Sequence, residues 1–246
     1  MEGNVTMMDE TSKVRSVELC EEITHASILL LLPNPVTSST LLFFHRYHER
    51  KSFSIDNAKK IASASLFLSC KIHENERHPL DIFNVLSILK SRKSTTERII
   101  ATPFSSEYIS FRDSLLEAEV ELVQVLGFDL RALTPHHFGI GILKQLSLID
   151  NKKIVQTSWN LFNDSMKIDL CNRFSMLSIS ISCVVLAARF EKVKLPQNWW
   201  NVFGEETIVI QNICQEIMNL LQKQHRLNAL TDKIDEEVCF HDIKSR

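Results

Sequence analysis

Histidines and glycines serve in many active sites, and in this chain their spacing argues against catalysis. His45 and His48 form one pair, and His136 and His137 form another. Neither pair has carboxylates or cysteines at metal-ligand spacing, so we expect packed, hydrogen-bonded rings. The five glycines, at positions 3, 127, 139, 141 and 204, do not form a phosphate-binding loop, and no kinase, nucleophile-elbow or HExxH motif is present. We predict that the chain is not an enzyme and has no cofactor or metal.

Two charges among apolar residues are better candidates for function. Leu68, Lys71 and Ile72 are spaced i, i+3 and i+4, so on a helix they share one face. Glu119 and Val123 share a face in the same way, four residues apart. A charge in such surroundings either extends along its own stem to water or meets the polar groups of a partner. In the second case the chemistry is recognition rather than catalysis.

These residues must be positioned by helices. Only five Gly and six Pro occur, and the stretches between them carry apolar residues at helical spacing, so we predict an all-α protein. The stretch 54–73 has small residues that let neighbouring helices approach, so it should be central, with the Ser54 hydroxyl as its N-terminal cap. The expected helices cover residues 17–32, 38–50, 54–73, 79–90, 106–126, 136–146, 152–168, 175–190, 198–202 and 205–224.

One short sequence motif occurs twice along the chain. Leu66–Ile72 and Val184–Phe190 are both apolar runs that contain a cation near their end. Each run is followed by a second repeated motif, Pro79–Leu86 after the first run and Pro196–Phe203 after the second. Two copies at this spacing predict tandem domains of about a hundred residues each. We place them at residues 17–132 and 133–226, with a polar tail over 1–16 and a second tail over 227–246.

The charge balance and the apolar runs exclude some classes of partner. With 28 basic and 30 acidic residues the formal charge is −2, so no overall field attracts nucleic acid or an anionic membrane. The uncharged run Phe174–Ala188 is shorter than the roughly 20 residues of a membrane span, and the acidic N-terminus is not a signal peptide. The six scattered cysteines are expected to be reduced. The partners should therefore be proteins, without direct nucleic-acid or membrane binding.

The ordered set of motifs resembles the cyclin family over roughly residues 17–225. It consists of residues 62–74, which include Lys71, then 118–122, 125–130 and 135–137. Within that family, residues 29–33, 43–47, 159–165, 186–189 and 200–204 are most similar to L-type and other transcription-associated cyclins. The chain departs from the pattern at His73, where relatives commonly carry Glu, and we do not expect the Arg- and Ser-rich tail of L-type cyclins.

The resemblance implies a fold, a partner and a site. The fold would be two tandem five-helix cyclin boxes with an extra N-terminal helix. The partner would be a cyclin-dependent kinase, bound by the first box as a heterodimer in the nucleus, in RNA polymerase II transcription or pre-mRNA splicing. Lys71 and Glu119 would form the polar centre of the contact with the kinase's regulatory helix. The other implied contact residues are Leu68, Ile72, Glu74, Val123, Phe128 and Leu130.

Two alternatives share much of this pattern. A TFIIB-type general transcription factor core has the same doubled fold but binds promoter DNA, for which the formal charge of −2 is unsuited. A pseudo-cyclin scaffold would have lost its kinase and would only join helices in a larger assembly. The presence of both Lys71 and Glu119 argues against such a scaffold. A DNA titration against salt distinguishes the first alternative from a cyclin.

Overall fold

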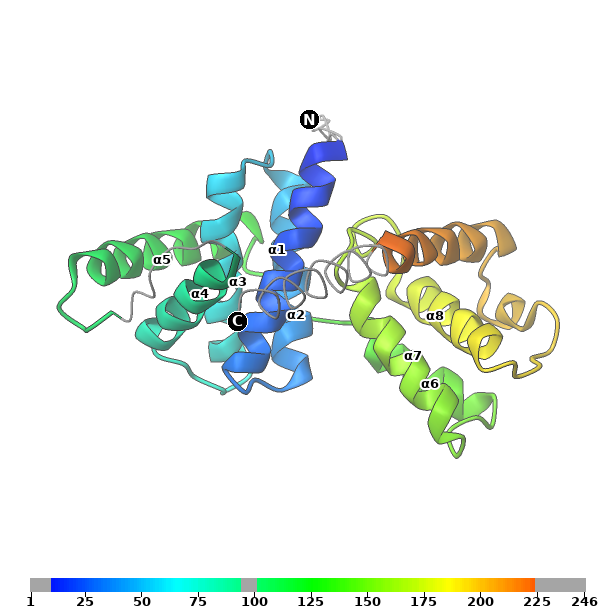
Figure 1. Cartoon of the computed structure of the whole chain (residues 1–246). Helices are drawn as coiled ribbons and strands as arrows, with labels where there is room; N and C mark the ends of the chain where they lie inside the picture. The colour runs from blue at the N-terminus through cyan, green and yellow to red at the C-terminus, as the bar shows by residue number, and fades with distance from the viewer. Residues whose placement is uncertain (1–9, 94–100, 224–246) are drawn as a thin grey trace, which may run out of the picture.

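The computed structural model describes residues 10–93 and 101–223, which form two helical bundles side by side (Figure 1). Within these ranges no strand occurs, and no helix is both long and apolar enough to cross a membrane. The first bundle contains α1 (Glu10–Leu29), α2 (Asn34–Arg50), α3 (Ile55–Ile72), α4 (Pro79–Lys93) and α5 (Ser106–Val125). The second contains α6 (Pro135–Gln145), α7 (Lys152–Ser165), α8 (Met176–Phe190), the 3₁₀ helix η1 (Trp199–Phe203) and a helix over 207–223.

Helix α3 is the centre of the first bundle, as predicted. All residues from 61 to 70 are buried, and α1, α2 and α5 pack around it. Small side chains such as Ala62 and Ala64 allow this approach, while Leu42, Phe44 and Leu122 from the surrounding helices fill the core. Ser54 precedes the helix as expected, but its hydroxyl makes no cap hydrogen bond. The predicted side-chain cap is therefore wrong.

Helix α8 has the same position in the second bundle. All residues from 178 to 188 are buried, and α6 and α7 pack on it. The two copies of the first repeated motif thus lie in two equivalent central helices. The two copies of the second repeated motif adopt different secondary structures. Pro79 begins a helix of 15 residues, whereas the later copy forms η1. Left-handed residues at both ends of η1, Asn198 and Gly204, limit it to one short turn.

The N-terminal helices begin earlier than expected. α1 starts at Glu10, so residues 10–16 of the expected tail are helical, and ion pairs at i, i+3 link Glu10 to Lys13 and Arg15 to Glu18. α2 starts at Asn34 because proline is tolerated in the first turn of a helix. Five helices, α1 to α5, are described before residue 130, and α1 is one of these five. Residues 1–9 and the expected C-terminal tail lie outside the described residues.

The two bundles are joined through buried histidines. His45 of α2 donates from Nε2 to the Met166 carbonyl at 3.0 Å, and its own carbonyl accepts from Asn172 at 3.0 Å. His136 of α6 lies 3.3 Å from the side-chain amide of Asn34 in α2, and within its own bundle it lies 2.9 Å from Asn163. The expectation of packed, hydrogen-bonded rings is confirmed for these two histidines. For His48 the packing is as expected, against aromatic rings, but the expected hydrogen bond is wrong, because neither ring nitrogen has a described partner.

Candidate partner-binding site

The two charges singled out from the sequence lie together on the surface of the first bundle. Lys71 is in the last turn of α3, and Glu119 faces it from α5. The Lys71 ammonium is 2.8 Å from both carboxylate oxygens of Glu119. The side chain of Lys71 is 44% exposed and that of Glu119 only 14% exposed. The pair therefore presents its cationic side to solvent, while the carboxylate is largely enclosed.

The apolar residues expected around this pair differ in their exposure. Ile72 and Phe128 are exposed, Phe128 at 73%, and both are available to a partner. Val123 and Leu130 are half-buried and also pack against the core of the first bundle. Leu68 is buried inside that core at 5% exposure, so it supports the surface from below rather than forming part of it.

The segment that carries Phe128 and Leu130 is fixed by the end of α5 and by two arginines of α2. Gly127 adopts a left-handed conformation with φ 65°, the expected helix-ending role, and Phe128 follows with φ 58°. Arg50 donates to the Val125 carbonyl and Arg46 to the Arg131 carbonyl at 2.8 Å. Because these bonds hold the chain on both sides of Phe128, its ring is presented by a fixed backbone.

His73 and Glu74 end α3 in different directions. The His73 ring lies 2.7 Å from the Ser39 hydroxyl, so it contacts α2, and its partial burial lowers the pKa of the imidazole. Glu74 is exposed with φ 54°, and its amide donates to the Lys71 carbonyl. The residue that departs from the cyclin pattern therefore faces the protein's own interior, and Glu74 provides an exposed carboxylate at this end of α3.

The second bundle does not reproduce the ion pair. Arg189 occupies the position in α8 that Lys71 has in α3, and it makes no ion pair with a described residue. Glu216, the acid available to it by sequence, instead accepts two hydrogen bonds from Arg173 at 2.7 and 2.5 Å. Arg173 precedes α8 and has no counterpart in the first copy of the repeat. Comparing the two copies in the sequence therefore did not predict that Arg173 pairs with Glu216.

One residue of the site was missed from the sequence. Phe67 lies one turn before Lys71, and the Lys71 ammonium is 4.1 Å from the centre of its ring. A cation over an aromatic face is attracted to the electrons of the ring, so Phe67 helps to orient Lys71 toward Glu119. The i, i+4 spacing of Phe67 and Lys71 was a usable signal for this contact.

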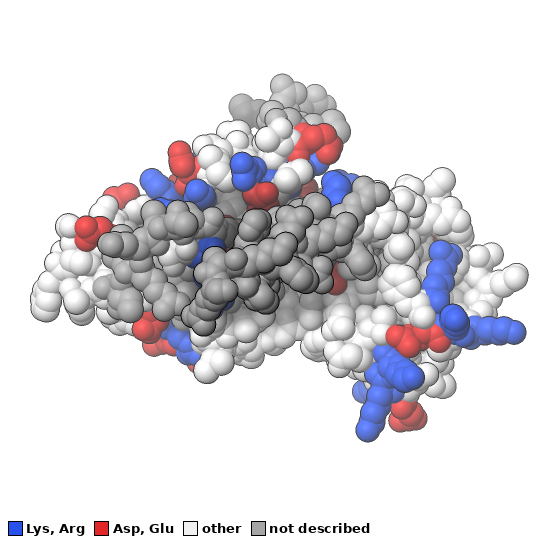
Figure 2. Space-filling model, viewed as in Figure 1, with Lys and Arg blue, Asp and Glu red and all other residues white. Residues whose placement is uncertain are grey.

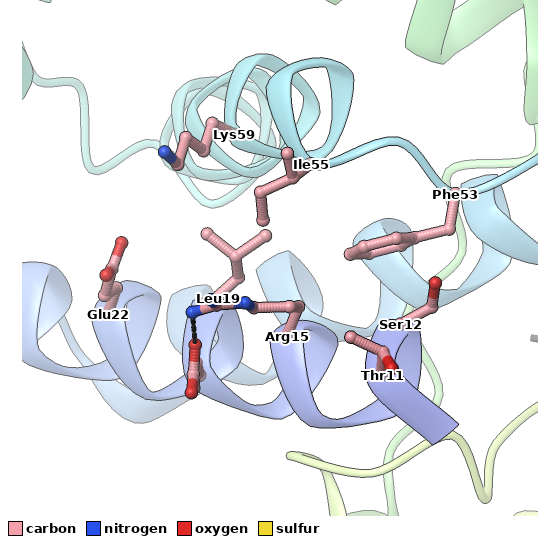
Figure 3. Close-up of a pocket in the computed structure, with 9 residues that line it drawn as sticks. Thr11, Ser12, Arg15, Leu19, Glu22, Phe53, Ile55 and Lys59 are labelled. Atoms are coloured by element: carbon pink, nitrogen blue, oxygen red, sulfur yellow. Dashed lines mark hydrogen bonds and ion pairs between the residues drawn. The ribbon is translucent and has the colours of Figure 1, made fainter. Parts of the chain in front are cut away.

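Other parts of the described chain offer little for catalysis. No group of three His, Cys, Asp or Glu residues among the described residues is placed to hold a metal ion. An open hollow lies between α1 and the start of α3 (Figure 3). At its rim Arg15 is held by Glu18 at 2.8 Å, and Leu19 and Phe53 belong to the core of the bundle. The arrangement around Lys71 and Glu119 is thus the site that best fits recognition of another protein.

Comparison with known proteins gives a consistent picture. Residues 19–131 match the family model of the cyclin N-terminal domain. Over 224 residues the chain is 33% identical to cyclin-L1 of Gallus gallus, covering 89% of this chain and 41% of that protein. The chain thus spans about two fifths of the length of the curated relatives it matches.

Solved structures share the fold. A chain of the yeast RNA Pol II CTD kinase CTDK-1 complex matches with a TM-score of 0.67 and 16% identity, over 86% of this chain and 71% of that one. A viral cyclin from Herpesvirus saimiri matches with a TM-score of 0.63 and 12% identity, over 87% of each chain. The predicted all-α fold with a cyclin-box arrangement is therefore confirmed.

Proposed function

Because residues 19–131 belong to the cyclin N-terminal domain family, we propose that this chain is the regulatory subunit of a cyclin-dependent protein kinase. Its similarity to cyclin-L1 and cyclin-L2 supports a role in RNA polymerase II transcription or pre-mRNA splicing, and hence a place in the nucleus. In this role the chain activates a protein kinase and does not itself transfer phosphate.

The observation that carries the proposal is the Lys71–Glu119 pair with exposed apolar side chains around it. An exposed ion pair adds little to the stability of a free protein. When a partner covers it, each charge needs a hydrogen-bonding group, so the same pair becomes a strong determinant of which partner fits. Ile72 and Phe128 supply exposed apolar area that a partner helix would bury.

The arrangement suits the way protein kinases are controlled. An active kinase needs an ion pair between a lysine of its sheet and a glutamate of its regulatory helix, and it needs its metal-binding aspartate in place. A rigid surface that packs on the regulatory helix favours the conformation in which both are formed. α3 and α5 offer such a surface, because α3 is buried on its other sides and the end of α5 is anchored by Arg46 and Arg50.

The direct test is to identify the kinase that co-purifies with the full chain. The tagged parent, Lys71→Ala/Glu119→Ala and Arg189→Ala are each purified from cells, and the bound proteins are identified by mass spectrometry. We expect one cyclin-dependent kinase to be enriched with the parent and with Arg189→Ala, and to be depleted with the double variant. Kinase activity of purified components should need both chains.

Two results would contradict the proposal. A kinase that is absent from all three samples would favour the pseudo-cyclin scaffold. Salt-sensitive binding of duplex DNA by the chain alone, without a kinase, would favour a TFIIB-like core. Equal kinase recovery with the parent and the double variant would keep the cyclin assignment but would reject the Lys71–Glu119 surface.

A further inference from the structure

Five lysines without ionic partners gather at one end of the second bundle. Figure 2 shows several basic side chains gathered there with a few acidic ones among them, while the first bundle also carries charges of both signs. All five are exposed, and none makes a described hydrogen bond or ion pair through its side chain. We call them the lysine cluster: Lys144, Lys152, Lys153, Lys192 and Lys194.

The fold brings these lysines together from three segments. Lys144 is in the last turn of α6, and the short turn after it leads to Lys152 and Lys153 at the start of α7. The Thr157 hydroxyl, one turn after Lys153, donates to the Glu191 carboxylate at 2.6 Å. That bond places the start of the segment 192–194 beside the first turns of α7. The nearby acids are Asp150 and Glu191, and Glu191 is already engaged by Thr157.

The position of Lys152 and Lys153 is unfavourable for the free protein. They occupy the first turn of α7, which contains no acidic residue. The positive end of the helix dipole lies there, so cations in that turn are repelled and anions are attracted. The repulsion among neighbouring lysines adds to this cost. Binding of an anionic group would relieve both effects.

We propose that the lysine cluster is a binding surface for a short, multiply phosphorylated peptide segment. Lysine ammonium groups bind phosphate as point charges, and several phosphates along an extended chain can reach lysines that come from different segments. A peptide fits better than a nucleic acid because the cluster is confined to one end of one bundle. Nucleic-acid surfaces usually extend as a basic stripe, while this chain has a formal charge of −2.

The test compares two full-length variants with the same change in charge. The cluster variant is Lys153→Glu/Lys192→Glu/Lys194→Glu, and the control is Lys51→Glu/Lys59→Glu/Lys60→Glu on exposed positions of the first bundle. A fluorescent ten-residue peptide with three phosphoserines, its unphosphorylated form and a single-stranded RNA of equal charge are the probes. Binding is measured by anisotropy at two salt concentrations, after thermal melts establish that each variant is folded.

We expect the parent and the control to bind the phosphopeptide, and the cluster variant to bind it at least about tenfold more weakly with a smaller salt dependence. The matching glutamine variants of Lys153, Lys192 and Lys194 should show a smaller loss in the same direction, and they serve as the test if the glutamate variant does not fold. Equal weakening in cluster and control variants would overturn the proposal. Tighter binding of the RNA, or equal binding of the unphosphorylated peptide, would also overturn it.

Discussion

Gly139 of α6 lies directly against the aromatic ring of Phe162 in α7. A β-carbon added at Gly139 would overlap the far edge of that ring, whereas one added at Gly141, in the same helix, would meet nothing within 4 Å. Phe162 is fully buried in the core of the second bundle, so its ring cannot turn out to solvent without leaving the core. The absence of a side chain at Gly139 is therefore what allows α6 to approach α7.

This contact predicts opposite effects for two similar substitutions. Gly139→Ala should lower the free energy of unfolding by about 1–3 kcal/mol, because it overpacks a filled core. Gly141→Ala should raise it by roughly 0.5–1 kcal/mol, because alanine loses less backbone entropy in an exposed helix. Urea unfolding of the two variants checks both signs. Similar effects for the two would mean that α6 and α7 are not packed as described.

The ion pair on the first bundle predicts a loss of binding without a loss of fold. Glu119→Ala should change the free energy of unfolding by no more than about 1 kcal/mol, because Lys71 is well exposed. Lys71→Ala should lower it by about 1–3 kcal/mol without unfolding the protein, because the largely enclosed Glu119 carboxylate loses its partner. Each should weaken kinase binding by roughly 2–5 kcal/mol, mostly through faster dissociation, since the remaining charge is buried without its partner. Surface plasmon resonance with the co-purified kinase measures this. Unchanged dissociation in both variants would exclude this surface.

Arg189 of the second bundle occupies the position that Lys71 has in the first, but we predict that it does not bind the kinase. Arg189→Ala should leave kinase affinity within about 0.5 kcal/mol of the parent, as expected for a residue outside the interface. The measurement is the same as for Lys71→Ala, so the two substitutions are a matched pair. A loss equal to that of Lys71→Ala in a folded variant would show that both bundles contact the kinase.

The buried histidines predict a loss of stability in acid. Burial lowers the pKa of His45 and His48 to about 4, from an ordinary value of 6.5. Because the folded state favours the neutral rings, the stability they contribute is complete above pH 6.5 and is lost as the pH falls from 6.5 to 4. NMR titration of the ring protons should show both residues still neutral at pH 5.5.

The two histidines should respond differently to phenylalanine. His48→Phe should be at least as stable as the parent at pH 7 and lose less stability in acid, because the His48 ring has no described hydrogen bond to lose. His45→Phe should be less stable at pH 7 by about 1–3 kcal/mol, because the Met166 carbonyl loses its donor. Urea midpoints at pH 7 and pH 5 distinguish the two cases. Equal acid sensitivity of His48→Phe and the parent would contradict the prediction.

Much of the fold could be predicted because helices are specified by local spacing. The repeated sequence motif indicated that α3 and α8 are equivalent helices of the two bundles. The small residues in 58–65 indicated close packing of other helices on α3. Gly127 was recognised as the end of α5 because a left-handed residue is needed there. The starts of α1 and α2 were less well predicted than those of the later helices. The polar first turns of α1 and the prolines at α2 carry weak signals, and neighbouring helices stabilise both segments.

The sequence by itself determined which residue types are available at the candidate site, including Lys71, Glu119 and the apolar residues near them. Only the tertiary structure decided that Leu68 is enclosed while Ile72 and Phe128 are exposed, because burial depends on helices that are distant in sequence. The same holds for Glu216, which pairs with Arg173 instead of Arg189. A net charge of −2 gave no sign of the lysine cluster, since a sum over the chain does not contain the positions at which packing places each charge.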